Sequence, residues 1–396
     1  MPVSNYQAPD LYIEEVPVGA RPIQAVGTSI AGFVGVAPNA GERRGEAVAI
    51  TNRTQFNDIY ASGGGRTNGR GAGAGNVLAR AIAGFFDNGG SMCYVCNIAS
   101  EADLAAGLDE LGRIDEIAIV AAPGITGAAA ADALLTHCEN LKDRVCIIDV
   151  PEGITDVNRL TRVATGDATD AEAGFRPRVS DNGFGAVYYP WIEVTDPYTR
   201  QPVFTPPSGH IAGIWARTDA TRGVHKAPAN EIIRGALRVQ KRLSRDEHGI
   251  LNSAGVNAIR FFSGEGVRVM GARTVAPAAN EFRYLNVRRL FSMVEESIAE
   301  SMRWVIFEPN DRPLWDLIRR DVTAFLLRIW RDGALQGATP QQAFFVKCDE
   351  ETNPQENIDA GIVTTVIGMA PVKPAEFVVF RISQYAGTES VEEGAE

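Results

Sequence analysis

The chain has 396 residues, of which 45% are hydrophobic and 22% are charged, and its formal net charge is −11 at pH 7. This length and composition predict a globular protein of two or three domains. The acidic balance argues against nucleic acid as a partner, because nucleic-acid binders present a broad basic surface. The start has no basic segment followed by an apolar core, and no apolar run approaches the roughly 20 residues that span a bilayer. We therefore expect a cytoplasmic protein without direct membrane insertion.

Residues 1–27 form the first predicted element, an N-terminal arm. Prolines punctuate this stretch around one short strand-like segment, which consists of Leu11, Tyr12, Ile13, Glu14, Glu15 and Val16. A lone strand leaves its backbone donors and acceptors unpaired until another edge supplies partners. The arm is therefore expected to pair with a strand from elsewhere.

An α/β domain is predicted over residues 28–200. Apolar runs at 117–122, 145–150 and 186–194 are separated by helical stretches such as 128–141. Alternation of this kind is typical of strands that are connected by helices.

A second, α+β domain is predicted over residues 201–374. Ser208 follows two prolines and is a candidate helix N-cap. Strands at 256–262 and 267–272 flank a Gly-containing turn and predict a hairpin. Two long amphipathic helices follow, at residues 287–305 and 314–331.

Residues 375–396 are predicted to form a C-terminal arm and an acidic tail. The arm contains a second strand candidate, whose residues after Glu376 are Phe377, Val378, Val379, Phe380, Arg381 and Ile382. The tail reads TESVEEGAE, and its small polar residues cannot build a core, so we expect it to be disordered.

Two motifs invite a chemical interpretation. The glycine-rich stretch 63–75 lacks the P-loop spacing and follows a helical stretch, so a flexible surface loop is favoured over a phosphate site. Cys93 and Cys96 form a C-x-x-C within a predicted strand, where residues three apart point to opposite faces. Core packing is therefore favoured over metal binding, and the odd number of cysteines favours a reduced compartment.

The histidines show no metal-binding or catalytic spacing, although a catalytic group assembled from distant segments stays open. Four tryptophans are expected in the core, namely Trp191, Trp304, Trp315 and Trp330. No enzyme activity, metal or cofactor is expected.

A series of short segments at both ends and in the second domain occurs in a recognisable order. They are 11–16 (LYIEEV), 28–35 (TSIAGFVG), 207–213 (PSGHIAG), 222–224 (RGV), 227–230 (APAN), 251–260 (LNSAGVNAIR), 271–274 (GART), 284–290 (YLNVRRL), 307–310 (FEPN), 332–337 (DGALQG) and 374–377 (PAEF). Together they resemble the contractile tail sheath family of phage tails, tailocins and related injection systems. The chain departs from the family's Pro-Gly-Val-Tyr at Pro9–Tyr12 and from its tryptophan at Met270.

The resemblance implies rings of six subunits that stack helically around an inner tube and contract to drive the tube through a target envelope. It also implies arms that exchange strands between neighbours, and baseplate and terminator proteins as further partners. Assembly would take place in the cytoplasm, within a virion or a phage-tail-like particle that lysis can release. Strand candidates at both termini fit such exchange independently, because added strands join chains through main-chain hydrogen bonds.

One face of helix 314–331 is a candidate for contact with the tube. Its apolar stripe must face the core, which places Arg320, Leu327 and Arg331 on the opposite side. A cationic strip beside an apolar residue suits an acidic tube surface, and the resemblance implies that a helix of this domain attaches to the tube. A solvated basic strip is the plainer alternative.

An α/β enzyme that binds a nucleotide or another small molecule remains the alternative function. The alternating region and the glycine-rich stretch support it, as does the open question of distant catalytic groups. A tube or baseplate role is a further alternative, which the two terminal arms disfavour. The sequence leaves open whether the machine is a phage tail, a tailocin or another injection system.

Overall fold

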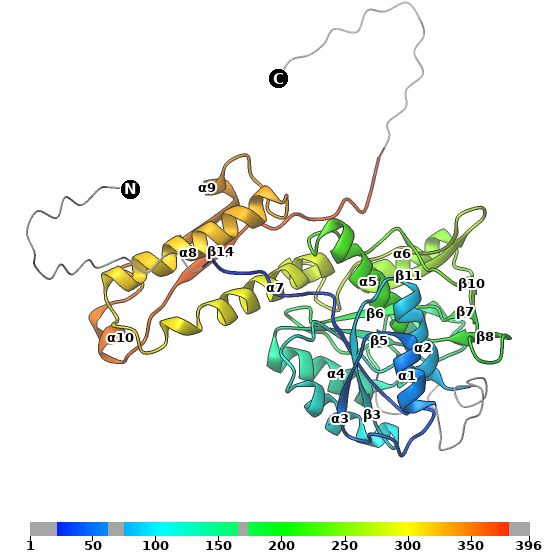
Figure 1. Ribbon diagram of the computed structural model, residues 1–396. Coiled ribbons are helices and arrows are strands. Elements are labelled where there is room, and N and C mark those ends of the chain that lie inside the picture. Colours follow the sequence, from blue (N-terminus) through cyan, green and yellow to red (C-terminus); the bar gives the residue numbers. More distant parts are fainter. Residues whose placement is uncertain (1–21, 62–74, 165–172, 380–396) are drawn as a thin grey trace, which may run out of the picture.

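The computed structural model describes residues 22–61, 75–164 and 173–379 (Figure 1). The predicted strand Leu11–Val16, most of the glycine-rich stretch, Phe380–Ile382 and the acidic tail lie outside the described residues. The mixed α/β and α+β fold class is confirmed, because a large sheet with covering helices is joined to a smaller helical part.

A nine-stranded sheet forms the centre of the molecule, in the order β2-β3-β1-β4-β5-β6-β11-β12-β9. The strands β3, β1, β4, β5, β6 and β11 run parallel, and β2, β12 and β9 add antiparallel edges. Their bounds are β1 Ala31–Gly35, β2 Ala47–Ile50, β3 Cys93–Asn97, β4 Ile119–Ala121, β5 Val145–Asp149, β6 Gly185–Tyr189, β9 Glu231–Ile232, β11 Val256–Phe262 and β12 Gly266–Val269.

Helices cover both faces of this sheet, so its parallel strands are buried on both sides. The helices are α1 Arg53–Tyr60, α2 Val77–Asp87 and α5 Ser208–Arg222 on one face, and α3 Leu104–Leu111, α4 Ala128–Leu141 and α6 Arg245–Ser253 on the other. Short 3-10 turns lie at Glu101–Asp103, Val157–Leu160, Glu281–Arg283 and Arg303–Val305. We call this sheet with its helices the central domain.

The predicted strand at 186–194 is divided between two sheets. Residues up to Tyr189 belong to β6, whereas β7 (Ile192–Thr195) lies in a three-stranded sheet with β8 (Pro202–Thr205) and β10 (Ala236–Val239). Pro190 separates the two strands, because proline has no N–H to donate to a ladder.

The predicted domain boundary at residue 200 is wrong. β11 lies beside β6 in parallel, with Val256 opposite Val187, so the large sheet continues to Val269. The hairpin of β11 and β12 is confirmed, but its strands complete the sheet and do not begin a new domain. Ser208 is also not an N-cap, because Pro207 occupies that position and the Ser208 hydroxyl donates to Asp149 instead.

A second unit, which we call the helical module, begins at α7 and extends away from the central domain (Figure 1). Its elements are α7 Leu285–Ser301, α8 Arg312–Arg331, α9 Pro340–Ala343, β13 Phe344–Lys347, α10 Gln355–Asp359 and β14 Val366–Met369. The strands β13 and β14 pair antiparallel as a separate two-stranded sheet.

Helix α8 forms as its sequence predicts. Asp311 caps its start by accepting from the Leu314 amide at 3.1 Å, and Gly333 follows its end with a φ of 80°. The predicted apolar stripe is buried in the module core, namely Leu314, Ile318, Val322, Phe325 and Ile329 with Trp315 and Leu326 at its border.

The tryptophan predictions are confirmed in part. Trp191 and Trp315 are buried, whereas Trp304 and Trp330 are only partly buried at the edge of the module core. The fully buried Trp215 in α5, by contrast, packs in the central domain.

Candidate functional site

The chain segment that enters the central domain is docked on the helical module. Ile23 is buried in the module core, and its carbonyl accepts from the Arg328 guanidinium at 2.5 Å. The Val26 amide donates to the Ser297 hydroxyl of α7 at 3.0 Å. We call residues 22–28 the N-terminal root. The predicted N-terminal arm of residues 1–27 is therefore too long, because its last residues are part of the folded body.

A buried ion pair ties this root to both parts of the molecule. Arg289 of α7 donates to the Thr28 carbonyl at 2.8 Å and pairs with Asp219 of α5 at 2.5 Å. Thr28 donates its hydroxyl to the same carboxylate at 2.7 Å. The root, the helical module and the central domain thus meet at one fully satisfied polar cluster.

The segment that leaves the helical module is anchored in the same way. The Val372 amide donates to the Ala334 carbonyl at 3.1 Å, and the Val372 carbonyl accepts from the Asn286 amide group at 3.1 Å. Four residues further on, Glu376 accepts two hydrogen bonds from Arg273, with Nε–Oε1 at 2.9 Å and Nη2–Oε2 at 2.6 Å. The C-terminal segment therefore also bridges the two units.

Beyond Glu376 the chain exposes a continuous apolar stretch. Phe377, Val378 and Val379 have exposed fractions of 76%, 70% and 79%. The predicted strand is not formed over these residues, because no second strand lies beside them in the described part of this single chain. The arm predicted from residue 375 is thus anchored to the folded body up to Glu376.

The two-stranded sheet of the helical module has two open edges in the described chain. β13 and β14 pair only with each other, so the outer side of each strand has unpaired backbone groups. Phe345 and Val366 on this sheet are also exposed. Open edges of this kind can accept an added strand from another chain.

The predicted tube-facing residues are placed only in part as expected. Arg320 and Arg331 are exposed on α8, and Arg320 pairs with the neighbouring Asp321 at 2.9 Å. Leu327 does not point away from the core but is partly buried against it. Because the N-terminal root and β13 both pack on α8, the buried face of this helix is wider than one stripe.

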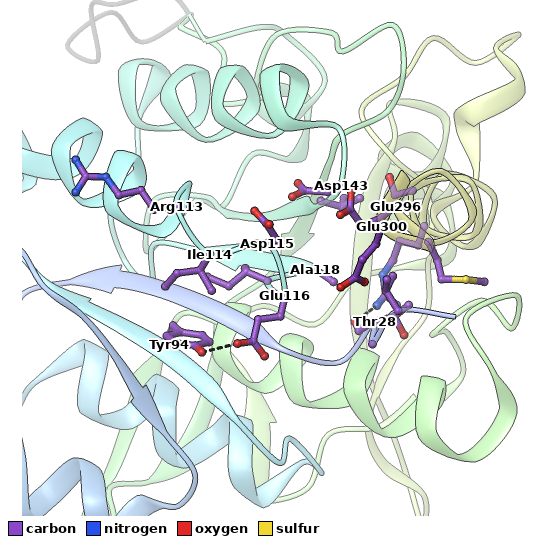
Figure 2. A pocket seen from close by; sticks show the side chains of 17 residues that line it. Thr28, Tyr94, Arg113, Ile114, Asp115, Glu116, Ala118, Asp143, Glu296 and Glu300 are labelled. Atoms are coloured by element: carbon purple, nitrogen blue, oxygen red, sulfur yellow. Dashed lines mark hydrogen bonds between the residues drawn. The ribbon is translucent and has the colours of Figure 1, made fainter. Parts of the chain in front are cut away.

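An acidic groove lies between α7 and the central domain, with a volume of about 620 Å³ (Figure 2). Glu296 and Glu300 of α7 face the loops that carry Asp115 and Asp143. Burial, together with the charges of Asp143, Asp115 and Glu300, raises the pKa of Glu296. The carboxylates therefore repel one another across the groove at neutral pH.

The two cysteines of the C-x-x-C lie on opposite faces of β3, as predicted. Cys93 packs in the core on one side of the sheet and Cys96 in the core on the other. Burial raises the pKa of both thiols, that of Cys96 to about 11. Neither thiol is therefore an activated nucleophile.

Ser208, His210 and Asp149 supply the three residue types of a catalytic triad. The Ser208 hydroxyl donates directly to Asp149 at 2.5 Å, so no imidazole lies between them to act as a base. His210 is buried beneath Gly84, where an added Cβ would lie 2.3 Å from the imidazole ring. Burial raises the pKa of Asp149 to about 6. This cluster holds the first turn of α5 against the end of β5.

Within the ranges that the structure describes, no group of three or more His, Cys, Asp or Glu side chains is placed to hold a metal ion. In those ranges, no helix combines the length and the apolar character that crossing a bilayer requires.

Comparison with known proteins decides the family. A model of the phage tail sheath protein central domain matches residues 98–275, and a model of the phage tail sheath C-terminal domain matches residues 278–384. The structure of the anti-feeding prophage helical sheath in the contracted state is 30% identical, with a TM-score of 0.75, and the match covers 96% of this chain and 99% of that one. The chain belongs to the contractile tail sheath family. The boundary between the two family models falls where the large sheet ends, not at residue 200.

Other sheath proteins are similar over different lengths. The PVC sheath complex of an extracellular contractile injection system, in its contracted state, has a TM-score of 0.78 at 27% identity over 98% of this chain and 100% of that chain. The tail sheath protein of Salmonella phage ViI is 29% identical over 286 residues, which are 68% of this chain and 44% of the relative. This sheath chain thus spans less than half the length of the curated phage relatives that it matches.

The sequence did not reveal the docking of Ile23 or the partner of Arg273. Both depend on contacts between residues more than 100 positions apart, which have no local signature. Only the short segments shared with the family gave a hint of the partner of Arg273. Arg273 lies in segment 271–274, and its hydrogen-bond partners lie in segments 251–260 and 374–377.

Proposed function

We propose that this chain is a structural subunit that polymerises helically around an inner tube and contracts to drive the tube through a target envelope. The single observation that carries the proposal is the pair of open edges on the sheet of β13 and β14, which could accept the strands that the sequence predicts in the two arms. The sequence predicts a strand in an arm at either terminus, and the helical module has a two-stranded sheet with two open edges among the described residues. Two arms received from neighbours would convert each such sheet into a four-stranded one.

An interface of this kind is heterologous, because the donating and accepting surfaces differ. Heterologous contacts that do not close generate helical arrays, and six subunits per ring is the symmetry that the family suggests. Main-chain hydrogen bonds between an arm strand and a neighbour's sheet would hold the subunits together. The arm between that strand and its own subunit could meanwhile change direction. Rigid bodies on such arms repack from an extended to a contracted array.

The exposed face of α8 is the surface that we assign to the inner tube. Arg320 and Arg331 supply positive charge in a chain whose net charge is −11, and the border residue Leu327 adds apolar contact. Exposed ion pairs are weak and screened by salt, so they set the register of the subunits on the tube and still release during contraction. Baseplate and terminator proteins would bound the array at its two ends.

The energy for contraction would come from new contacts between subunits, with no nucleotide, metal or enzymatic step. A metastable extended state that is held by a kinetic barrier needs only a trigger to convert. We place assembly in the cytoplasm and release of the finished particle at lysis.

Electron microscopy of the purified full-length chain tests this proposal. Helical tubes with a cogwheel cross-section are expected, with and without the inner tube. Discrete monomers that bind a nucleotide tightly would instead favour the α/β enzyme. A melting temperature raised by ATP or lowered by a chelator would favour the same alternative, because a bound ligand stabilises the folded state.

A further inference from the structure

The segment between Val372 and Glu376, which we call the strap, is held at its two ends and crosses a cavity between them. At one end, Val372 is bonded to the helical module by its amide and carbonyl. At the other end, Glu376 is bonded to the central domain. A cavity of about 510 Å³ lies behind the strap and is lined on the body side by residues that include His225, His248 and Met270.

The bond at Glu376, which we call the clasp, is specific in geometry. Arg273 forms two parallel hydrogen bonds to the carboxylate, and the Tyr284 hydroxyl adds a third contact at 3.3 Å. Arg273 also donates to the Asn252 carbonyl at 2.8 Å, which fixes the orientation of the guanidinium. Although burial alone would raise the pKa of Glu376, the hydrogen bonds from Arg273 lower it, so the carboxylate is charged at neutral pH.

Arg273 itself is tied to the middle of the large sheet by one buried amide. The side chain of Asn257 on β11 accepts from the Arg273 amide at 2.7 Å and donates to the Arg273 carbonyl at 2.8 Å. The same amide group donates to the Val187 carbonyl of β6 at 3.0 Å. A Cβ at Gly271 would approach the side-chain oxygen Oδ1 of Asn257 to 2.7 Å, so glycine is needed beside this support.

Resting on the proposed function, we propose that the Arg273–Glu376 clasp is the joint that fixes the C-terminal arm to the central domain. A pull on the arm then passes from Glu376 through Arg273 and Asn257 to β6 and β11, and not to the small sheet of the helical module. With the clasp closed, the arm swings from Phe377. With the clasp broken, residues 373–376 join the free arm and lengthen it by about 13 Å when extended.

Arg273 and Glu376 are therefore positioning residues, because the strand that reaches a neighbour lies beyond them. The alternative is a strap fixed by Val372 alone, with the arm swinging from the helical module. The two arrangements differ in how freely residue 375 moves relative to the central domain. This difference exists in the single subunit, before any sheath forms.

Spin labels on the full-length subunit measure this freedom. Ala375→Cys and Arg113→Cys place one label on the exposed part of the strap and one on the exposed surface of the central domain, and the native cysteines are all buried. With the clasp intact, the pair should give one narrow distance distribution. Glu376→Gln should broaden that distribution at least about twofold, because four residues gain the freedom of a tethered chain.

Glu193→Gln is the matched control, since Glu193 forms an equivalent double hydrogen bond with Arg238 at 2.6 and 2.7 Å in the three-stranded sheet. It should leave the distribution narrow. Arg273→Lys, which keeps the charge but not the paired geometry, should broaden it to an intermediate degree. An equally narrow distribution in Glu376→Gln, or a broad one in the unmodified subunit, would overturn the proposal.

Assembled sheaths give a second readout. Glu376→Gln subunits keep both arm strands, so they should still polymerise, but with a wider spread of helical rise than Glu193→Gln sheaths. Equal regularity would show that the clasp does not set the geometry of the arm. Absence of any sheath from the unmodified chain would contradict the proposed function, while the distance measurement on single subunits would stand.

Discussion

The central domain and the helical module differ in how completely they satisfy their own backbone. In the central domain, seven of the nine strands in the order β2-β3-β1-β4-β5-β6-β11-β12-β9 have a neighbour on both sides, and helices cover both faces. In the helical module, the sheet has only two strands, each with one open edge. The same chain thus contains one large sheet in which most strands are paired on both sides and one small sheet in which neither strand is. We propose that strands from other copies complete the small sheet.

The largest expected effect comes from removing the C-terminal arm directly after its last anchored residue, Glu376. Deleting residues 377–396 keeps the clasp at Glu376 and removes only residues beyond the packed body. We expect a folded subunit whose melting temperature is unchanged but which forms no tubes, as judged by electron microscopy.

Deleting residues 1–20 should have the same outcome, because Ile23 and the N-terminal root stay in place. The matched control removes only residues 388–396, which leaves the predicted strand intact and should permit assembly. Ordered sheaths from either arm deletion would contradict the proposal that the helical module needs a strand from a neighbouring subunit.

The next effect tests the outer face of the helical module. Arg320→Glu with Arg331→Glu changes two exposed side chains of α8, so the fold should survive. Contracted-type sheath should still polymerise, but extended sheath around the tube should be lost, because the register on an acidic tube depends on these charges. Electron microscopy of particles assembled with the tube distinguishes the two states.

Arg43→Glu with Arg113→Glu is the control for this double mutant, since it makes the same change in net charge on exposed residues of the central domain. This control should assemble normally. Normal extended particles from the α8 double mutant would assign the tube contact to another surface.

The sequence predicts local elements well and contacts between distant segments poorly. Local patterns predicted α4 and the buried stripe of α8 to the residue, and the opposite faces of Cys93 and Cys96 follow from strand geometry. The error at residue 200 arose because the pairing of β11 with β6 joins residues about 70 positions apart, which no periodicity reports.

The candidate site was predicted less well than the fold. The sequence predicted a strand that includes Phe377–Val379. In the structure these side chains are exposed, and no strand is formed over them. The roots at Ile23 and Glu376 were assigned to the arms, because proline-rich and polar sequence resembles a linker even where one buried side chain or one ion pair docks it.

The smallest expected effect concerns the groove between the two units. Glu296 has a raised pKa in the folded chain, so folding favours its protonated form and stability should rise as the pH falls through that pKa. Glu296→Gln should remove part of this dependence. Because the Glu296 side chain is partly exposed, we expect Glu296→Gln to raise the free energy of unfolding by only about 0.5 kcal/mol at pH 7.

Thermal unfolding between pH 4 and pH 8 checks this effect. Glu308→Gln, an exposed carboxylate in the helical module outside the groove, is the control and should leave the pH dependence unchanged. If Glu296→Gln lowered the stability at neutral pH, repulsion across the groove would be excluded. The contact between the central domain and α7 would then be neutral or attractive.

Hydrogen exchange at the two-stranded sheet tests the central claim most directly. Ala370 donates its amide to Ala343, so by alternation along the ladder the amides of Val346 and Ile367 face the open edges. In single subunits these two amides should exchange rapidly, and in assembled sheath they should be protected by at least about a hundredfold, as strand addition requires. Exchange at the same rate in subunits and in sheath would contradict the claim that neighbouring copies complete the helical module.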